Sequence, residues 1–254
     1  MQQINHRLLI AYDGTGYRGW QVQGTAPTIQ LHLETVLSQL WQTDIRIHGS
    51  GRTDTGVHAR GQVAHFLAPA RFKSPQKLKE AMNALLPPTI RIRKVDHPSL
   101  HFHSRFSAKG KEYEYRITHH GEGSPFEINY AWQLKRQLNT KAMQEAAQEL
   151  IGKHDFAAFA SNPGYSRETT VRTIYNILFT SRKNLLTLRF TGSGFLYRMV
   201  RNLTGALVRV GDGRLQPTDI KRILKSASRS QAPPPAPAAG LYLNRVYYRQ
   251  IKNK

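Results

Sequence analysis

Strand-like and helix-like stretches alternate along this chain in a similar order in its two halves, and this alternation limits the folds that the chain can adopt. The expected strands, with apolar residues at alternate positions, cover 7–12, 45–48, 62–67, 111–118, 170–180, 185–191 and 241–249. The expected helices, with apolar residues three and four apart, cover 28–42, 74–86, 139–152, 195–210 and 217–225. Neither half carries the glycine-rich phosphate-binding motif of a dinucleotide-binding fold. The alternation of strands and helices predicts an α+β protein in which helices cover one face of a mixed or antiparallel sheet.

Residues that typically begin and end helices support these boundaries. Thr28 is the expected N-cap of the first helix, and Ser74 followed by Pro75 opens the second. The two prolines at 87–88 end that second helix because proline lacks the amide hydrogen that continues it. The proline-rich stretch at 231–240 is expected to be an extended loop.

The charge balance indicates a polyanionic partner. The 254 residues include 37 Lys and Arg against 16 Asp and Glu, which gives a net charge of +21 at pH 7. A surplus of this size attracts nucleic acid and exceeds what solubility requires. An anionic membrane is disfavoured because no expected helix combines a lysine-lined face with a strongly apolar one.

Features that the sequence lacks exclude several kinds of site and classes of protein. Cysteine is absent, which excludes disulfides, thiolate catalysis and cysteine-based zinc sites and fits a reducing cytoplasm. Residues 1–16 do not resemble a signal peptide, and no apolar run approaches the roughly 20 residues of a transmembrane helix. The histidines at 101–103 and 119–120 have no carboxylates at ligand spacing, so no metal is expected.

One carboxylate, Asp54, stands out within the sequence GSGRTDTGVHARGQVAHF at 49–66. It lies in a short loop between Gly51 and Gly56, two residues after Arg52, with an expected strand on each side. A loop held between strands can aim a reactive side chain at a substrate. An aspartate in such a turn also commonly accepts hydrogen bonds from its own backbone, and spacing alone favours that interpretation. In the absence of a cysteine or a serine-centred nucleophile motif, Asp54 is the leading candidate for a nucleophile or base.

Two other groups of residues suit an RNA substrate. Tyr113 and Tyr115 are two apart on an expected strand and share a face, where they can stack on a base or fill a core. Arg198 and Arg201 are neighbours on the helix that follows Gly194. These arginines can hold phosphate, pair with a carboxylate or line a solvated edge, and spacing leaves the three roles open.

Seven blocks of sequence occur in an order and with a content that identify a family. They are DGTGYRGWQVQ at 13–23, GRTDTGVHARGQVAHF at 51–66, ALLPPTIRI at 84–92, FHSRFSAKGKEYEYRI at 102–117, GKHDFAAFA at 152–160, GSGFLYRMVRNLTGALVRVG at 192–211 and APAAGLYLNRVYY at 236–248. Together they resemble the TruA family of tRNA pseudouridine synthases, nearly from end to end. Thr55 is a departure, since the family more often has alanine there, and this small residue is expected to have little effect.

The resemblance implies an isomerase that converts uridine to pseudouridine at positions 38, 39 and 40 in the anticodon arm of tRNA. The reaction breaks the N1–C1′ bond, rotates the uracil and rejoins it through C5, and it needs no cofactor. The resemblance also implies two related ferredoxin-like halves, at 1–104 and 105–254, with the active cleft between them. It further implies a cytoplasmic homodimer that binds tRNA.

The family's functional residues map onto five positions of this chain. Asp54 corresponds to the family's catalytic aspartate, which either attacks a carbon or removes a ribose proton, and the sequence does not choose between these routes. Arg52 corresponds to the residue that enters the space left by the flipped base. Tyr113 corresponds to the tyrosine that stacks on the uracil, and Leu241 to an apolar residue beside it. Arg201 corresponds to the arginine that pairs with the aspartate.

Two alternatives stay open on the sequence. The first is a non-catalytic tRNA-binding protein, which the presence of Asp54, Tyr113 and Arg201 together disfavours. The second is a pseudouridine synthase that acts on another RNA, which the dense match to this one family disfavours. Release of tritium from C5-labelled uridine separates an enzyme from a binder, and mapping of the modified nucleotide separates the targets.

Overall fold

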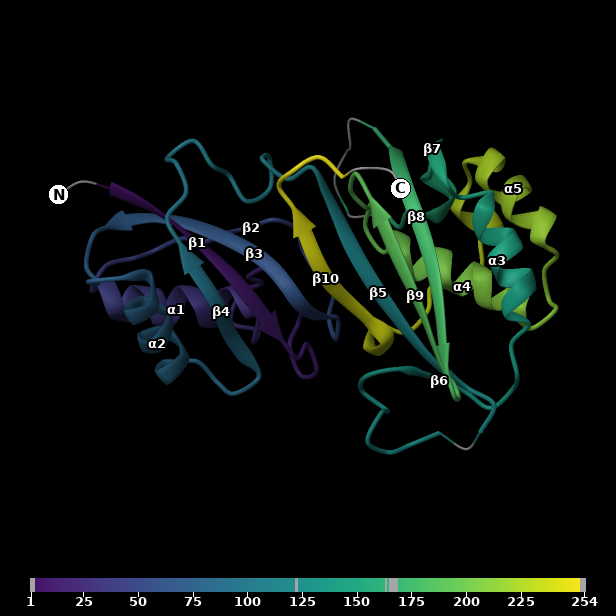
Figure 1. The fold of residues 1–254 in the computed structure, drawn as a ribbon, viewed down its shortest axis with the longest axis horizontal. Helices are drawn as coiled ribbons and strands as arrows, with labels where there is room; N and C mark the ends of the chain where they lie inside the picture. The colour runs from purple at the N-terminus through teal and green to yellow at the C-terminus, as the bar shows by residue number, and fades with distance from the viewer. Residues whose placement is uncertain (1–2, 122, 163, 165–168, 252–254) are drawn as a thin grey trace. The chain divides into compact units, whose positions relative to one another are not determined.

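The computed structural model describes residues 3–121, 123–162, 164 and 169–251 (Figure 1). These residues form ten strands, five α-helices and three short 3-10 helices. Contacts divide the chain into two compact units. Unit 1 comprises 1–109 and 242–250, and unit 2 comprises 110–241 and 251–254.

Unit 1 contains a sheet whose central strand is β1. Strand β1 (Gln3–Tyr12) runs antiparallel to β4 (Ile90–Asp96) on one side and to β3 (His58–Pro69) on the other. The far edge of β3 pairs with the short antiparallel β2 (His48–Gly49) and with β10 (Leu241–Tyr247), which is parallel to β3. The last strand of the chain therefore completes the sheet begun by the first.

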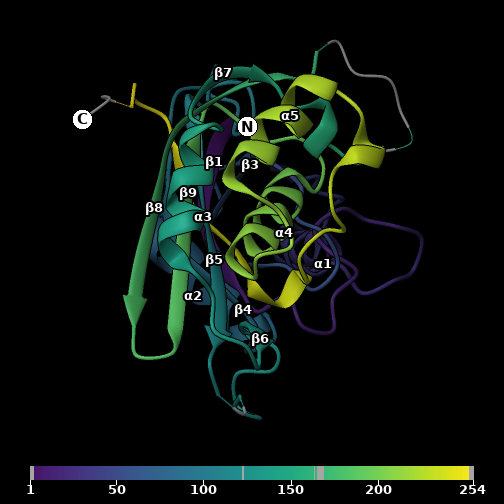
Figure 2. The ribbon, with the colours of Figure 1, turned by 90° about the vertical axis from the view of Figure 1, so that its right-hand side faces the viewer.

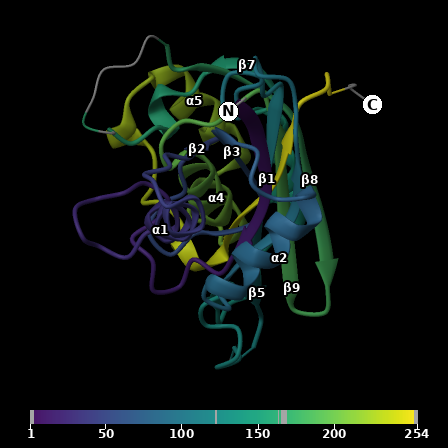
Figure 3. The ribbon, with the colours of Figure 1, turned by 90° about the vertical axis from the view of Figure 1, so that its left-hand side faces the viewer.

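Two capped helices accompany this sheet. The N-cap residue of α1 (Ile29–Trp41) is Thr28, whose hydroxyl accepts from the amide of Leu31, and Ser74 caps α2 (Pro75–Leu85) in the same way, as predicted. The ring of Trp41 packs edge-on against Phe66 of β3, with ring centroids 5.4 Å apart. Helix α1 lies on one side of β1 in both turned views (Figures 2 and 3). Its buried face thus supports the strands that flank the Asp54 loop.

Unit 2 contains its own set of paired strands, which is also mixed. Its strands follow the order β5 (Gly110–His119), β9 (Leu185–Gly192), β8 (Val171–Arg182) and β7 (Gly152–Asp155), all antiparallel to their neighbours. A short strand, β6 (Trp132–Leu134), pairs with β5 in parallel. Because each unit combines parallel and antiparallel pairs with helices, the predicted α+β protein with a mixed sheet is confirmed.

The core of unit 2 lies between this sheet and its helices. The helices are α3 (Thr140–Gln148), α4 (Met199–Gly211) and α5 (Pro217–Ser226). Alternate residues of β9 are buried, and both Leu188, opposite Tyr115 of β5, and Phe190 are fully inaccessible. Helices α4 and α5 lie on the same side of β5, β9 and β8 in Figures 2 and 3. No helix among the described residues is both long enough and apolar enough to span a membrane.

Some predicted boundaries were wrong, and local geometry explains them. The helix predicted over 195–210 begins at Met199, because Arg198 adopts a left-handed conformation with φ of 57°. The helix predicted over 139–152 ends at Gln148, and Gly152 begins β7 instead. The strand predicted over 45–48 shrinks to β2, whereas β4, with buried Ile90 and Ile92, was not predicted.

Candidate active site

The Asp54 loop runs from β2 to β3 within unit 1, and its middle is fixed by the residue before the acid. The hydroxyl of Thr53 lies 2.8 Å from the buried phenol oxygen of Tyr12, and its carbonyl accepts from the amide of Trp20 at 3.0 Å. The carbonyl of Asp54 itself accepts from the amide of Val57 at 3.1 Å. Asp54 is half-buried. The loop therefore holds the backbone of the acid in place while its side chain keeps partial access to solvent.

A neighbouring glycine loop packs directly on this turn. Gly19 has a positive φ of 81°, and a Cβ atom built on it would lie 2.5 Å from the carbonyl oxygen of Thr53. The amide of Gly56 donates to the carbonyl of Tyr17 at 3.3 Å. The DGTGYRGWQVQ block thus braces the Asp54 loop, and glycine at 19 is required by both conformation and close approach.

A buried amide side chain fixes the beginning of the loop. Gln62 of β3 is fully buried, and its Oε1 accepts from the hydroxyl of Ser50 at 2.7 Å and from the amide of Val63 at 3.1 Å. Its Nε2 donates to the carbonyl of Gly51 at 2.8 Å. This glutamine therefore satisfies buried polar groups on both sides of the turn that leads to Asp54. This role was not predicted from the sequence, because a glutamine within a strand pattern has no distinctive spacing.

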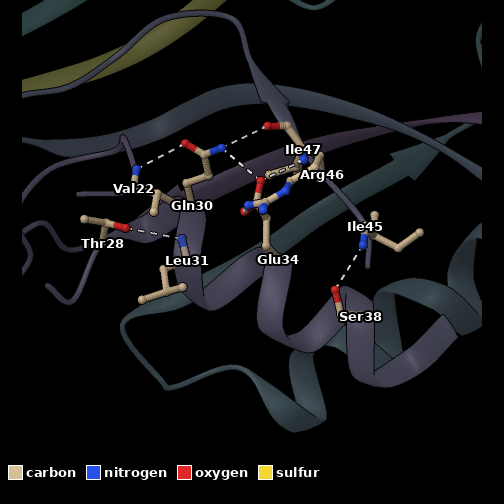
Figure 4. A network of polar contacts seen from close by, with 9 residues as sticks. All are labelled: Val22, Thr28, Gln30, Leu31, Glu34, Ser38, Ile45, Arg46 and Ile47. Atoms are coloured by element: carbon tan, nitrogen blue, oxygen red, sulfur yellow. Dashed lines mark hydrogen bonds and ion pairs between the residues drawn. The ribbon is translucent and has the colours of Figure 1, made fainter. Parts of the chain in front are cut away.

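A polar network ties α1 to the chain segment that enters β2 (Figure 4). The buried carboxylate of Glu34 accepts from the amide of Ile47 at 3.1 Å and from a guanidinium nitrogen of Arg46 at 3.0 Å. Gln30 donates to the same carboxylate at 2.9 Å and to the carbonyl of Ile47 at 3.3 Å. Helix α1 thereby sets the position of the segment that continues through β2 into the Asp54 loop.

Arg52 stands at the solvent side of this loop. Its side chain is exposed, and its Nε donates to Oε1 of Gln21 at 3.0 Å. Gln21 belongs to the same glycine-rich block that braces Thr53. Arg52 and Asp54 are thus presented together by two interlocked loops of unit 1.

The other three predicted site residues belong to unit 2. Arg201 is half-buried on α4, and its Nε donates to the carbonyl of Ala236 at 2.8 Å. The amide of Ala236 donates back to the carbonyl of Arg201 at 3.0 Å. These two hydrogen bonds anchor the extended proline-rich segment on α4 and restrain the Arg201 side chain at its Nε atom.

The same proline-rich segment leads to Leu241. The phenol of Tyr115 donates to the carbonyl of Pro237 at 2.7 Å, and a Cβ on Gly240 would lie 2.7 Å from the Tyr115 ring. Leu241 follows at once, and its side chain is buried. Tyr115 thus has the structural role that its spacing left open, and the segment brings Leu241 and Arg201 onto one support.

Tyr113 lies two residues before Tyr115 on β5. It is 8% exposed, and its ring meets Phe195 edge to face at 5.2 Å. Across the strand pair it lies opposite Phe190 of β9. The ring of Tyr113 is therefore nearly buried and contacts aromatic neighbours. Among the described residues, no three His, Asp or Glu side chains gather as they would around a metal ion.

Comparison with known proteins identifies the family. A family model described as tRNA pseudouridine synthase matches residues 8–107 and 146–249. The chain is 42% identical to tRNA pseudouridine synthase A of Methylacidiphilum infernorum, with 96% of each chain covered. It is 44% identical to the proteins of the same name from Chlamydia muridarum and Geobacillus kaustophilus, over 95% of this chain and 91% and 93% of theirs. The chain belongs to the tRNA pseudouridine synthase family.

The family match covers most of the predicted site residues. Arg52 and Asp54 fall within the first matched segment, and Arg201 and Leu241 fall within the second. Tyr113 lies between the two segments. The matched segments also contain Tyr12 and Gln62, so the residues that fix the Asp54 loop belong to the part of the chain that defines the family.

Proposed function

We propose that this synthase converts uridine to pseudouridine in the anticodon arm of tRNA, at positions 38, 39 and 40. The observation that carries the proposal is the setting of Asp54 in a member of this family. Its loop is fixed by Tyr12, Gly19 and Gln62, and the acid is the one carboxylate of the turn. A loop fixed in this way suits a catalytic side chain, which must be positioned against one particular atom of the substrate.

The chemistry explains why a carboxylate is suitable. The N1–C1′ bond breaks, the uracil turns, and a C5–C1′ bond forms while C5 loses a proton and N1 gains one. Asp54 either bonds covalently to the substrate or removes a ribose proton to give a glycal, and both routes regenerate the carboxylate. No electrons are gained or lost overall, so the proposed reaction requires no redox cofactor.

The other residues receive roles that follow from their chemistry. Arg201 is proposed to pair with Asp54 and keep it ionised and oriented. Tyr113 is proposed to stack on the uracil and Leu241 to line the pocket beside it, and their apolar surroundings support both roles. Arg52 is proposed to fill the space that the flipped base leaves, and its exposure supports that role.

The partner and the setting are part of the same proposal. With a net charge of +21, the protein is suited to grip tRNA phosphates, which supply affinity rather than sequence choice. We also propose that it works as a homodimer in the cytoplasm. The absence of cysteine fits a reducing compartment.

The decisive experiment compares the wild type with Asp54→Asn. Tritium release from a C5-labelled tRNA transcript should fall by about 10⁴-fold or more, because the amide is neither a nucleophile nor a base. Binding of the transcript should be retained, since Asp54 does not contribute to phosphate affinity. Turnover by the variant at a rate near that of the wild type would remove Asp54 from the reaction. Binding without any tritium release by the wild type would indicate a tRNA-binding protein instead.

Substitution of Arg201 tests the proposed ion pair. Arg201→Ala should lower kcat by about 10²-fold, because the acid loses its charged partner. Arg201→Lys keeps the positive charge but not the Nε bond to Ala236, so an intermediate rate is expected. Both rates would be measured by tritium release, with thermal unfolding as the control for the fold. A wild-type rate in the alanine variant would exclude Arg201 from the site.

A further inference from the structure

An exposed aromatic residue lies in unit 1 outside the set of predicted site residues. The side chain of Phe106 is 75% exposed, in the turn that follows Phe102. A single exposed apolar residue is ordinary, because more than half of a folded protein's surface is apolar. What distinguishes Phe106 is the rigidity of its turn and the charge around it.

The turn at 103–107 is closed by its own hydrogen bonds. The amide of Ser107 donates to the carbonyl of His103 at 2.9 Å, and the amide of His103 donates to the hydroxyl of Ser107 at 3.0 Å. The amides of Arg105 and Phe106 both point at Nδ1 of His103, at 3.1 and 3.3 Å. The backbone of Phe106 is therefore held in one conformation although its side chain lies in solvent.

The turn is also fixed to the sheet through Ser104, which is fully buried. Its hydroxyl donates to the carbonyl of His48 in β2 at 2.6 Å, and its amide donates to Nδ1 of His65 in β3 at 3.2 Å. Its carbonyl accepts from the phenol of Tyr248 at 2.8 Å. These contacts present Phe106 rigidly, so a partner that binds it does not have to order the turn.

The surroundings of Phe106 are cationic and aromatic. The guanidinium carbon of Arg105 lies 5.6 Å from the centroid of the Phe106 ring, and the ring of His103 lies 4.3 Å away. The stretch 97–109 contains no Asp or Glu, and it includes histidines, an arginine and a lysine. An exposed aromatic ring beside an arginine combines a stacking face with a charge that attracts phosphate.

We propose that Phe106, with Arg105 beside it, is a stacking platform for an unpaired base of the RNA substrate. The proposal rests on the proposed function for the identity of the RNA. Ser104 is bonded to β2 at His48, and Asp54 stands six positions after His48 in the chain. An extended chain of that length spans at most about 20 Å. Ser104 thus lies near enough to Asp54 for one RNA loop to contact both. Because the reacting base is engaged at Asp54, the platform binds another unpaired base of that loop and orients the anticodon arm on unit 1.

Binding measurements with paired variants test this platform. Phe106→Leu keeps the apolar side chain but removes the stacking face, and it should raise the Kd for an anticodon stem–loop RNA by about tenfold. Phe106→Trp should bind at least as tightly as the wild type. All variants would be measured in an Asp54→Asn background, so that turnover does not alter the RNA. The control is Phe126→Leu, the same change at an 88% exposed phenylalanine of unit 2.

Abasic substitution identifies the base that stacks. Each unpaired loop nucleotide would be made abasic in turn, and at one position the tenfold effect of Phe106→Leu should vanish, because the stacking partner is already gone. The slope of log Kd against log salt should be unchanged by Phe106→Leu and reduced by about 0.7 by Arg105→Gln. An effect of Phe106→Leu equal at every abasic position, or no effect on Kd at all, would overturn the proposal.

Two further measurements separate this proposal from others. If Phe106→Leu changes the molar mass in light scattering and leaves RNA affinity intact, the surface contacts another protein chain, and the platform is refuted. Tritium release by the Asp54-containing enzyme tests the proposed function separately. Stacking without tritium release would retain the platform in an RNA-binding protein, whereas tritium release with unchanged affinity of Phe106→Leu would retain the enzyme and refute the platform.

Discussion

At the scale of residues, the proposed catalytic residue Asp54 depends on uncharged neighbours that hold the backbone of its loop. Thr53 makes the key contacts, since its hydroxyl meets Tyr12 and its carbonyl meets Trp20. Neither partner is charged, and neither lies near the acid in sequence. Positioning of this kind lowers the cost of reaching the reactive geometry without any contact to the substrate.

Removal of one hydroxyl tests this positioning. Tyr12→Phe leaves the buried hydroxyl of Thr53 without its partner, so the free energy of unfolding should fall by about 1–3 kcal/mol. The kcat should fall by about 10- to 100-fold, because the Asp54 loop shifts. The matched control is Tyr17→Phe, which removes a phenol that is bonded to Thr89 instead of the loop. Equal kcat values for the two variants, measured by tritium release, would contradict the positioning role of Tyr12.

At the scale of elements, helix α1 sets the path of the chain into β2. Only Glu34, among the residues of its buried face, carries a charge there, and it binds the backbone of Ile47 as well as Arg46. A buried carboxylate requires such partners, because desolvation of the charge is costly. The helix and the Asp54 loop are therefore coupled through one side chain.

Substitution of Glu34 measures this coupling. Glu34→Ala leaves the buried amide of Ile47 without an acceptor and should lower the free energy of unfolding by about 2–4 kcal/mol. Glu34→Gln keeps an acceptor oxygen and should cost about 1 kcal/mol. Glu80→Ala is the control, because its pair with Lys77 is exposed, and it should leave the urea midpoint nearly unchanged. Urea unfolding would report all three, and equal losses for Glu34→Ala and Glu80→Ala would refute the coupling.

At the scale of the whole molecule, buried histidines make stability depend on pH. Burial lowers the pKa of His6 to about 4 and that of His65 to about 4, with the nearby histidines His97 and His103 adding to the effect. In the unfolded chain the pKa of each returns to about 6.5. Between these values the unfolded chain binds more protons than the folded one, so acid favours unfolding.

The expected result is a loss of stability as the pH falls from about 6.5 to 4, with little contribution from these two histidines above pH 6.5. His6→Leu should make this dependence shallower, because one buried titrating group is removed. Urea unfolding midpoints measured across this range would show it, with His101→Leu at an exposed position as the control. A wild-type slope in the His6 variant would show that His6 does not contribute.

Most helices and strands could be predicted from the sequence, whereas several of their boundaries could not. Helices α1 and α2 were predicted with their caps, because the capping signal at Thr28 and Ser74 is local. The start of α4 was missed, because the left-handed conformation of Arg198 is one that an arginine rarely adopts and that its residue type does not signal. Strand β4 was missed because its pattern of Ile90 and Ile92 among basic residues is short.

The candidate site divides in the same way. Asp54 and its loop could be singled out from residue types alone, because a lone aspartate among glycines and arginines is recognisable in the sequence. The supports of the loop were not predicted, since Tyr12, Gly19 and Gln62 are separated from one another along the chain and meet it through the pairing of β1 with β3 and the packing of the glycine loop. The platform at Phe106 was not predicted either, because exposure of an aromatic residue has no signature in its spacing.

The sequence by itself determined the class of fold, the basic character and the identity of the family, because periodicity, charge and ordered motifs are local or additive properties of residues. The tertiary structure alone decided which buried groups hold Asp54, why Tyr115 is structural, and how β10 completes the sheet of unit 1. These outcomes depend on which distant segments become neighbours. That choice follows from the packing of whole elements and the satisfaction of buried polar groups, which no single stretch of residues specifies.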